Sequence, residues 1–523
     1  MRLGIDFGTT RTVVAAADRG NYPVISFDTP EGGSAEWFPS LVAVRGDERV
    51  YGWDAWVRQG EPDWTVVRSI KRVLENAGPR TILRIGDHAV VLFDVVREMA
   101  ASLRAALVEH SSLQAAPGEK LEVMLGVPAN SNSNQRFMTT EAFRAAGFEV
   151  AGLLNEPSAA SVEFGHRNRA AGLILVYDLG GGTFDASLVE INDWVHDVVA
   201  SEGIATLGGD DFDHVLAEMA LEAFGAASME QLSAGELFRL HEECRHKKEA
   251  LRPNARKITV DLEHVRDDWG SVAIPVADYY ARCRPMVEET LNAVNDLLAA
   301  NAERNIDALY VTGGGSELPL IARVLKEDFG RRVRRSAYTR SATAIGLAIQ
   351  ADVHSGYILR EQFTRNFGVW REAEAGHRVT FDPLFAKGTL LPPPGGRPLS
   401  ITRSYSSAHN IGHFRYLECS QVSSDDQPAG DITVWDEILF PFDPSLRDRQ
   451  DLENAPVHRS DGAVGQRIEE RYACDSGGAV AVTIANLTAG YERQYRLGRW
   501  AANEAPLMPG RKRRATAVKK QAG

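Results

Sequence analysis

The sequence predicts an α/β domain followed by a mainly antiparallel β-sandwich, and two observations carry this prediction. Up to about residue 350, short apolar runs typical of buried strands, such as residues 121–128 and 172–180, alternate with helical segments. From about residue 367, the strand-like runs alternate apolar with polar residues and are separated by Gly, Pro, Asp and Ser. Strands that alternate with helices favour α/β layers, whereas closely spaced alternating strands favour a sandwich.

The first part contains helices between its strands. A polar loop after residue 128 opens into a helix that we expect to stop at Gly147. An earlier helix is indicated by apolar residues at helical spacing, which we expect to pack on the core: Leu92, Val95, Val96, Met99, Leu103 and Leu107.

The second part contains a series of short alternating segments. We expect strands at residues 377–382, 399–406, 414–422, 431–439, 467–474 and 479–487. The run Asp475-Ser476-Gly477-Gly478 is typical of a hairpin turn between the last two.

Composition limits the class of protein. The chain has 523 residues, so we expect roughly two to four domains. The net charge of −13 argues against a general nucleic-acid or anionic-membrane binder, and we expect neither as a partner. The cysteines match no metal-ligand spacing and are expected to be reduced thiols: Cys244, Cys283, Cys419 and Cys474. No apolar segment suited to a signal peptide precedes the first strand, so a cytoplasmic location is expected.

Two segments repeat one pattern in which a strand ends in an aspartate followed by glycine and threonine. The first contains Asp6, Gly8, Thr9 and Thr10, and the second contains Asp178, Gly180, Gly181, Gly182 and Thr183. Glycine lets backbone N–H groups approach phosphate oxygens closely, and threonine adds a hydroxyl donor. A single copy would more often be a simple β-turn. Two copies with matching flanks predict hairpins that clamp a triphosphate, with aspartates holding water on a divalent cation.

Two further glycine-rich segments fit the same cleft. Gly208 and Gly209 precede a helix, which makes an anion site at its N-terminus. Gly313, Gly314 and Gly315 end a strand, and we expect a helix to open at Ser316 or Glu317. Each segment alone is also compatible with an ordinary strand–helix turn.

The order of these motifs resembles that of the actin-like ATPase superfamily, and within it the seventy-kilodalton heat-shock chaperones of the DnaK type. The resemblance covers residues 1–351 and rests on GIDFGTTRT, SIKRVL, GVPANSNSNQR, LLNEPSAASVEFG, VYDLGGGTFD, TLGGDDFDH, CRHKKEAL and VTGGGSELP. It implies two lobes with duplicated ribonuclease-H-like sheets, followed by a β-sandwich. The segment RIEERYACDSGGAVAVTIANL is similar, more weakly, to a hairpin of the family's substrate-binding domain.

The resemblance implies four regions with different functions. Residues 1–352 would form the nucleotide-binding ATPase domain, 353–366 the interdomain connector, 367–500 the sandwich that binds substrate or a partner, and 501–523 a basic, disordered tail. The connector lacks the family's leucine run, so we expect coupling between the domains to be lost or built differently. Only about two dozen residues follow the last strand near Arg499, too few for a helical lid.

The resemblance also implies roles for individual residues. Lys71 would position the attacking water and the γ-phosphate, although a lone lysine of this kind is more often a solvated helix residue. Glu156 would lie near the metal and that water, and it is also placed to stabilise a helix N-terminus. Pro128 and Arg136 would relay the nucleotide state to the sandwich, although proline after a strand is common anyway.

The implied sets are as follows. The catalytic residues are Asp6, Lys71, Glu156, Asp178 and Thr183. The acids around magnesium and potassium are Asp6, Glu156, Asp178 and, through water, Asp185. The nucleotide contacts are Gly8, Thr9, Thr10, Gly180, Gly181, Gly182, Thr183, Gly208, Gly209, Lys248, Arg252, Gly313, Gly314, Gly315 and Ser316.

The base half of the implied pocket departs from the family pattern. Arg245 stands where a glutamate usually contacts the ribose, Glu317 where an arginine often stacks on adenine, and Arg11 where an aromatic residue is usual. Arg252, in place of a serine, is our candidate for the missing cation over the purine. ATP remains the expected nucleotide.

The implied function is slow ATP hydrolysis coupled to the binding of unfolded or extended polypeptide, with a J-domain co-chaperone and a nucleotide-exchange factor as partners. Two alternatives stay open. The sandwich can instead dock one dedicated partner under nucleotide control. A sugar or acetate kinase of the same superfamily is less favoured, because no constellation for a second substrate is visible.

Overall fold

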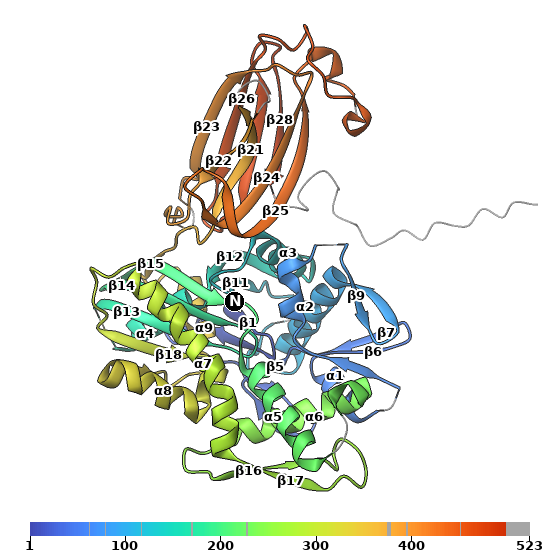
Figure 1. The fold of residues 1–523 in the computed structure, drawn as a ribbon, viewed down its shortest axis with the longest axis vertical. Coiled ribbons are helices and arrows are strands. Elements are labelled where there is room, and N and C mark those ends of the chain that lie inside the picture. The colour runs from blue at the N-terminus through green and yellow to red at the C-terminus, as the bar shows by residue number, and fades with distance from the viewer. Residues whose placement is uncertain are drawn as a thin grey trace, which may run out of the picture.

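Two differently built parts lie end to end along the long axis of the molecule, an α/β body and a β-rich module (Figure 1). This computed structural model describes residues 1–497 except Pro62, Pro79, Pro117, 169–170, 226–227, 374–377, 394–395 and Gln450. The predicted tail at 501–523 and the expectation about a lid fall outside these residues.

The first lobe of the body is built on a five-stranded sheet of order β12-β11-β1-β2-β5. Its strands are β1 (Arg2–Phe7), β2 (Arg11–Ala16), β5 (Phe38–Pro39), β11 (Glu122–Val127) and β12 (Glu149–Asn155). The β1–β2 pair is an antiparallel hairpin, and β1 pairs in parallel with β11. The helices α2 (Leu92–Glu109) and α3 (Ser133–Ala145) follow the predicted spans, and all predicted apolar positions of α2 are buried.

The second lobe repeats this arrangement in a six-stranded sheet of order β19-β18-β13-β14-β15-β20. Its strands are β13 (Gly172–Leu179), β14 (Phe184–Asn192), β15 (Val195–Ile204), β18 (Ala308–Thr312), β19 (Val333–Arg335) and β20 (Ile358–Arg360). Again a central antiparallel hairpin, β13–β14, has a parallel neighbour, β18. The helices α4 (Glu156–Asn168) and α9 (Ala342–Ala351) pack between the sheets, in a core shared by residues of both lobes. The duplicated α/β architecture is thus confirmed.

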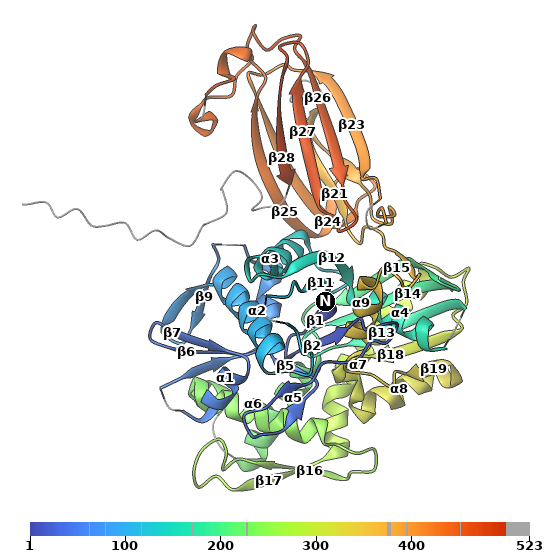
Figure 2. The same cartoon turned by 180° about the vertical axis from the view of Figure 1, so that it is seen from behind.

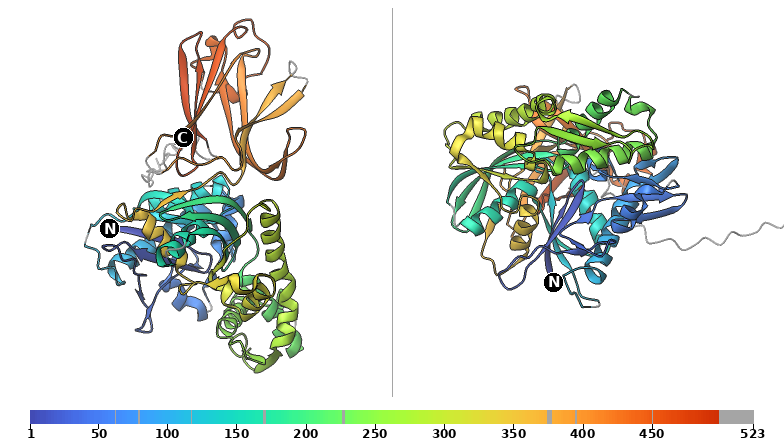
Figure 3. Two further views of the ribbon diagram at one scale, coloured as in Figure 1. Left: turned by 90° about the vertical axis from the view of Figure 1, so that its left-hand side faces the viewer. Right: turned by 90° about the horizontal axis from the view of Figure 1, so that it is seen from below.

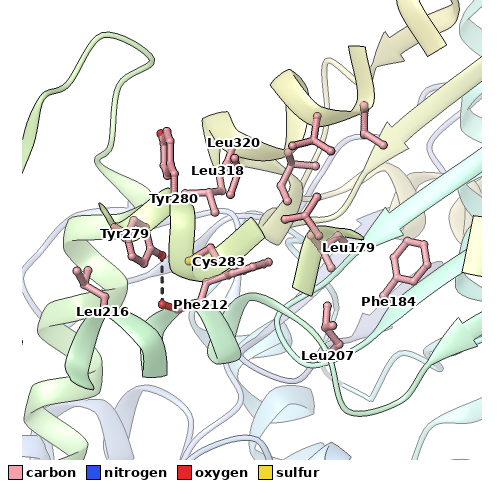
Figure 4. Close-up of a cluster of buried hydrophobic side chains, with 14 of the residues drawn as sticks. Leu179, Phe184, Leu207, Phe212, Leu216, Tyr279, Tyr280, Cys283, Leu318 and Leu320 are labelled. Carbon is pink, nitrogen blue, oxygen red and sulfur yellow. Dashed lines mark hydrogen bonds between the residues drawn. The ribbon is translucent and has the colours of Figure 1, made fainter. Parts of the chain in front are cut away.

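Further elements complete each lobe. In the first lobe they are β3 (Phe27–Asp28), β4 (Ser34–Ala35), β6 (Val42–Arg45), β7 (Glu48–Tyr51), α1 (Trp53–Val57), β8 (Thr65–Val67), β9 (Ile82–Ile85) and β10 (His88–Val91). In the second they are α5 (Gly209–Phe224), α6 (Ala234–Glu249), β16 (Lys257–Asp261), β17 (Ser271–Pro275), α7 (Val276–Ala299) and α8 (Pro319–Phe329). Figure 4 shows part of the second lobe's core, where the Tyr279 hydroxyl donates to the carbonyl of Phe212 over 3.1 Å.

Short 3₁₀ helices complete the body and the β-rich module. They are η1 (Arg58–Gly60), η2 (Ile70–Asn76), η3 (Met229–Gln231), η4 (Gly314–Glu317), η5 (Gly330–Arg332), η7 (Pro444–Leu446) and η8 (Leu452–Asn454). The prediction that a helix begins at Ser316 or Glu317 is therefore wrong in its exact start. The chain makes η4 first, Leu318 is extended, and α8 begins at Pro319, whose fixed φ suits the first helical position.

The β-rich module consists of two four-stranded sheets, β22-β21-β24-β25 and β23-β26-β27-β28. The strands are β21 (Asn366–Ala373), β22 (Arg378–Phe385), β23 (Leu399–Ser406), β24 (Ile411–Val422), β25 (Pro428–Pro441), β26 (Arg467–Cys474), β27 (Val480–Asn486) and β28 (Tyr491–Leu497). All pairings are antiparallel, and one aromatic-rich core lies between the sheets. The predicted sandwich is confirmed, and the turn at Asp475 closes with a 3.0 Å bond from its amide to the carbonyl of Ala479.

Other expectations concern the connector, the cysteines and membrane segments. Residues 358–360 form β20, which pairs in parallel with β15, so part of the predicted connector belongs to the second lobe's sheet. The domain boundaries themselves stay predictions. All four cysteines are free and buried, as expected. Within the described ranges, no helix is both long and apolar enough to cross a membrane.

Candidate functional site

A cavity of about 350 Å³ lies between the two lobes, and both glycine hairpins open onto it. It brings together most of the predicted site residues: Asp6, Gly8, Thr9, Thr10, Lys71, Glu156, Asp178, Gly180, Gly181, Thr183, Gly209, Lys248, Gly313, Gly314 and Gly315. Gly182, Gly208 and Ser316 lie behind this lining, and Asp185 lines a small adjoining cavity with Lys71 and Thr183. Arg252 is exposed and does not line the cavity.

The tips of the two hairpins touch, and this contact requires glycine. A Cβ atom on Gly181 would lie 2.7 Å from Oγ1 of Thr10, and one on Gly182 would lie 2.6 Å from Oγ1 of Thr9. A Cβ on Gly208 would lie 2.6 Å from the backbone nitrogen of Gly182, so the loop before α5 packs equally closely. The glycines therefore allow three loops to converge on one point, where the Thr9 and Thr10 hydroxyls lie close to the backbone of the other two loops.

Lys71 and Glu156 form an ion pair at the inner end of the cavity. The chain places Lys71 on η2 with only 5% of its surface exposed, and its Nζ lies 2.5 Å from Oε1 of Glu156. Burial disfavours the charged ammonium, but Glu156 and Asp6 raise the pKa of Lys71 overall. The alternative of a solvated helix lysine is thus excluded. Glu156 is also the first residue of α4, which confirms its place at a helix N-terminus, while its role near a metal and water stays a prediction.

Three aspartates surround this pair. Burial, aided by the charge of Glu156, raises the pKa of Asp6 and of Asp185 to about 7, and burial raises that of Asp178 well above its usual range. Glu156 adds a fourth carboxyl group, and Lys71 is a cation that these acids share. A divalent cation would favour the ionised forms of the three aspartates. Among the described residues, no group of three or more His, Cys, Asp or Glu side chains is arranged to hold a metal directly.

The far end of the cavity is built by charged and aromatic residues of both lobes. Arg11, Trp37, Arg245, Glu249 and Arg340 line it. The sequence analysis did not identify Trp37, Glu249 or Arg340 as site residues. Trp37 and Arg340 lie outside the motifs that were matched, and Glu249 lies next to Lys248, the matched position of its motif. Lys248 lies between the two ends, where its Nζ donates to the carbonyl of Gly209 over 2.5 Å and pairs with Asp213 at 2.8 Å.

A chain of contacts leads from the inner end of the cavity to the β-rich module. The Asp185 carboxylate accepts a 2.8 Å bond from the amide of Ala129, next to Pro128. The Pro128 carbonyl in turn accepts from the Ser131 hydroxyl over 2.7 Å, and Nε of Arg136 donates to the Ser131 carbonyl over 3.4 Å. Pro128 and Arg136 therefore lie on one path of contacts, and their shared role in relaying the nucleotide state stays a prediction.

The two parts of the molecule meet beside α3 (Figure 2), and Figure 3 shows the β-rich module stacked on the α/β body in a side view. One contact lies at the N-terminus of α3. The Ser133 amide there donates to Oε1 of Glu418 on β24 over 3.1 Å, and Nε of Arg365 lies 3.6 Å from the same carboxylate. Nζ of Lys387 adds an ion pair with Glu202 on β15 at 3.0 Å. A cavity of about 200 Å³ remains at this junction, lined by Arg136, Glu418 and neighbours from both parts.

Comparison with known proteins identifies the family. The model of the Hsp70 protein family matches residues 92–364. A chaperone protein HscA homolog of Chromobacterium violaceum is 32% identical over 375 residues, which cover 68% of this chain and 59% of that protein. The chaperone protein DnaK of Deinococcus deserti is 28% identical over 544 residues, covering 95% of this chain and 78% of that protein. The chain thus spans less than two thirds of the HscA homologues it matches. It belongs to the Hsp70 family.

Proposed function

We propose that the protein binds ATP between its lobes, hydrolyses it slowly, and uses the nucleotide state to control binding of unfolded or extended polypeptide by the β-sandwich. The contact between the two glycine hairpins beside the buried Lys71–Glu156 pair carries this proposal. Such a site presents backbone N–H groups and hydroxyls of Thr9, Thr10 and Thr183 to phosphate oxygens from both sides.

Phosphoryl transfer to water needs alignment and neutralisation of charge more than covalent help. Lys71 supplies a fixed cation at the inner end of the cavity, and Glu156 holds its Nζ in place. Asp178 and Thr183 come from the opposite hairpin. Closure of the lobes would therefore bring this pair and the Lys71–Glu156 pair together at the γ-phosphate. Hydrolysis is then limited by how well the two lobes hold this arrangement.

Magnesium fits the acidic inner end, where Asp6, Asp178 and Asp185 gather around the Lys71–Glu156 pair with raised pKa values, because a bound cation would favour the ionised forms of these aspartates. Magnesium usually keeps several waters and takes other ligands from phosphates, so these carboxylates would hold its waters. The ion would neutralise the phosphates of the nucleotide. Potassium is proposed for the same acids on the family resemblance alone.

Coupling to the sandwich would follow the path from Asp185 through Pro128 and Arg136 to Glu418. The connector supports this, because β20 is hydrogen-bonded to the second lobe while Arg365 reaches the sandwich carboxylate. The missing leucine run is thus compensated by strand pairing and ion pairs. We also propose a J-domain co-chaperone and an exchange factor as partners, and a cytoplasmic location, from the family.

ATPase turnover measured with and without a panel of unfolded peptides tests this function. Stimulation by many unrelated peptides is expected of a chaperone. Turnover that ignores every peptide would instead favour the alternative, a module that docks one dedicated partner under nucleotide control.

A further inference from the structure

The end of the cavity away from Lys71 is organised around Glu249, the last residue of α6. Its carboxylate lies 2.8 Å from Nη2 of Arg11, 3.3 Å from Nη1 of Arg340 and 3.7 Å from Nη1 of Arg245. Burial by itself would raise the pKa of Glu249, but the three guanidiniums lower it to about 2. One carboxylate is thus shared by three cations, all of which line the cavity.

Arg11 is the member of this group that lies closest to an aromatic ring. It follows Thr10 directly, at the start of β2, and its guanidinium carbon lies 4.8 Å from the centroid of the Trp37 ring. Trp37 packs in turn on Trp53 and Trp56, at centroid distances of 4.9 and 5.7 Å. The guanidinium therefore lies over an aromatic ring of its own lobe and is paired with Glu249 of the other lobe.

Two donors at this end lack a partner. Nε of Arg11 and Nε of Arg245 are buried, and neither has a hydrogen-bond partner in the described structure. A buried unpaired donor costs free energy, which a ligand with acceptor atoms would recover. The ring nitrogens of a nucleobase and the hydroxyls of ribose are acceptors of this kind, and they would reach this end if the phosphates occupied the glycine loops.

We propose that Arg11, whose guanidinium lies over the Trp37 ring, is the platform on which the base of the bound nucleotide stacks. A planar cation favours the electron-rich face of a purine, and guanidinium groups stack well on flat rings. The platform belongs to the first lobe, whereas the sequence suggested Arg252 of the second lobe, whose side chain is exposed outside the cavity. This inference rests on the proposed nucleotide binding.

Calorimetric titrations with magnesium and either ATP or inorganic tripolyphosphate separate the two ends of the site. The unmutated protein should bind ATP more tightly than tripolyphosphate, because only ATP carries a base. Arg11→Ala should weaken ATP binding about 10-fold, the scale of a base–side-chain stacking contact, and leave tripolyphosphate binding unchanged. Arg11→Lys keeps the positive charge but lacks the planar guanidinium, so it should recover only part of the lost ATP affinity. Arg19→Ala, an exposed arginine of the same lobe, is the matched control.

The outcomes against the inference are distinct. Equal affinity of the unmutated protein for ATP and tripolyphosphate, or equal losses for both ligands in Arg11→Ala, would overturn the platform and leave the proposed function intact. A loss of ATP affinity in Arg252→Ala without one in Arg11→Ala would move the platform to Arg252. Failure of both ligands to bind would overturn the proposed function as well.

Tryptophan fluorescence gives a second readout that needs no change at Arg11. A base over the Arg11–Trp37 pair should quench the emission of Trp37, so ATP should change the fluorescence and tripolyphosphate should not. The change should disappear in Trp37→Phe and persist in Trp194→Phe, whose side chain is exposed on the β14–β15 turn. Persistence of the full change in Trp37→Phe would contradict the platform.

Discussion

The two ends of the cavity between the lobes, the proposed phosphate end and the proposed base end, are held together in different ways. At the proposed phosphate end three loops pack closely: a Cβ atom on Gly181 or Gly182 would lie 2.6–2.7 Å from the hydroxyls of Thr10 and Thr9, and one on Gly208 would lie 2.6 Å from the backbone nitrogen of Gly182. At the other end, guanidiniums and carboxylates of both lobes pair across the cleft, with Glu249 at the centre. The first end depends on local backbone shape, and the second on side chains from distant segments.

This difference indicates which end of the cavity can tolerate amino-acid substitutions. Backbone contacts of this closeness admit only glycine, whereas an ion-pair group can be rebuilt with other charges as long as the partners match. We therefore expect substitutions at the phosphate end to affect ATP and tripolyphosphate alike, and substitutions at the base end to affect ATP alone.

The largest effect is expected at Lys71. Lys71→Ala removes the fixed cation, so turnover should fall on the order of 10²-fold or more, while nucleotide binding survives through the backbone contacts. Single-turnover hydrolysis and calorimetry measure the two quantities separately. Lys120→Ala, an exposed lysine of the same lobe, serves as the control. Full turnover in Lys71→Ala would remove this residue from the mechanism.

Gly208→Ala should be next in effect. The new Cβ would press on the backbone of Gly181 and Gly182, so the hairpin must shift. We expect a loss of about 1–3 kcal/mol in stability and weaker binding of both ATP and tripolyphosphate. Thermal unfolding and calorimetry test this, with Gly235→Ala, which meets no close atom in α6, as the control. Weaker binding of ATP alone would show that the two ends are not separable.

Glu418→Gln tests whether the junction with the sandwich receives a signal from the cavity. The change removes the charge that accepts from the Ser133 amide and faces Arg365, so it should weaken the junction by about 1.5–3 kcal/mol. Limited proteolysis of the connector should then proceed faster and respond less to ATP, as it should in a Pro128 variant. Glu492→Gln on the exposed face of β28 is the control.

The premise of this prediction can be tested first. If the connector of the unmutated protein is cleaved equally fast with and without ATP, then neither Pro128 nor Glu418 carries a signal.

The smallest effect is expected for Arg340→Ala. Its guanidinium ties Glu317 at 2.5 Å and Glu249 at 3.3 Å, but the side chain is 39% exposed, so the pairs contribute about 1 kcal/mol or less. ATP affinity should fall a few-fold at low salt and less at high salt, and tripolyphosphate affinity should not change. Arg331→Ala, an exposed arginine nearby in the chain, is the comparison. An equal loss for both ligands would break the distinction between the ends.

The alternating α/β body and the sandwich could be predicted because strand length, alternation and glycine position are local signals, whereas the duplication of the sheets was implied by the family resemblance. The glycine motifs also predicted that Thr9, Gly181 and Gly209 share one cavity. Arg252 stands where the family has a serine, but α6 ends at Glu249, and the side chain of Arg252 is exposed to solvent. Trp37 and Arg340 carry no local signal, since their roles depend on tertiary packing of the two lobes.

The central claim is that two glycine hairpins grip a magnesium-bound triphosphate between the lobes. Calorimetric titration of the purified chain with ATP, with and without magnesium, tests it most directly. We predict saturable binding that requires magnesium and is also seen with tripolyphosphate. Absence of magnesium-dependent ATP binding would contradict the claim and leave the sandwich to be explained without a nucleotide.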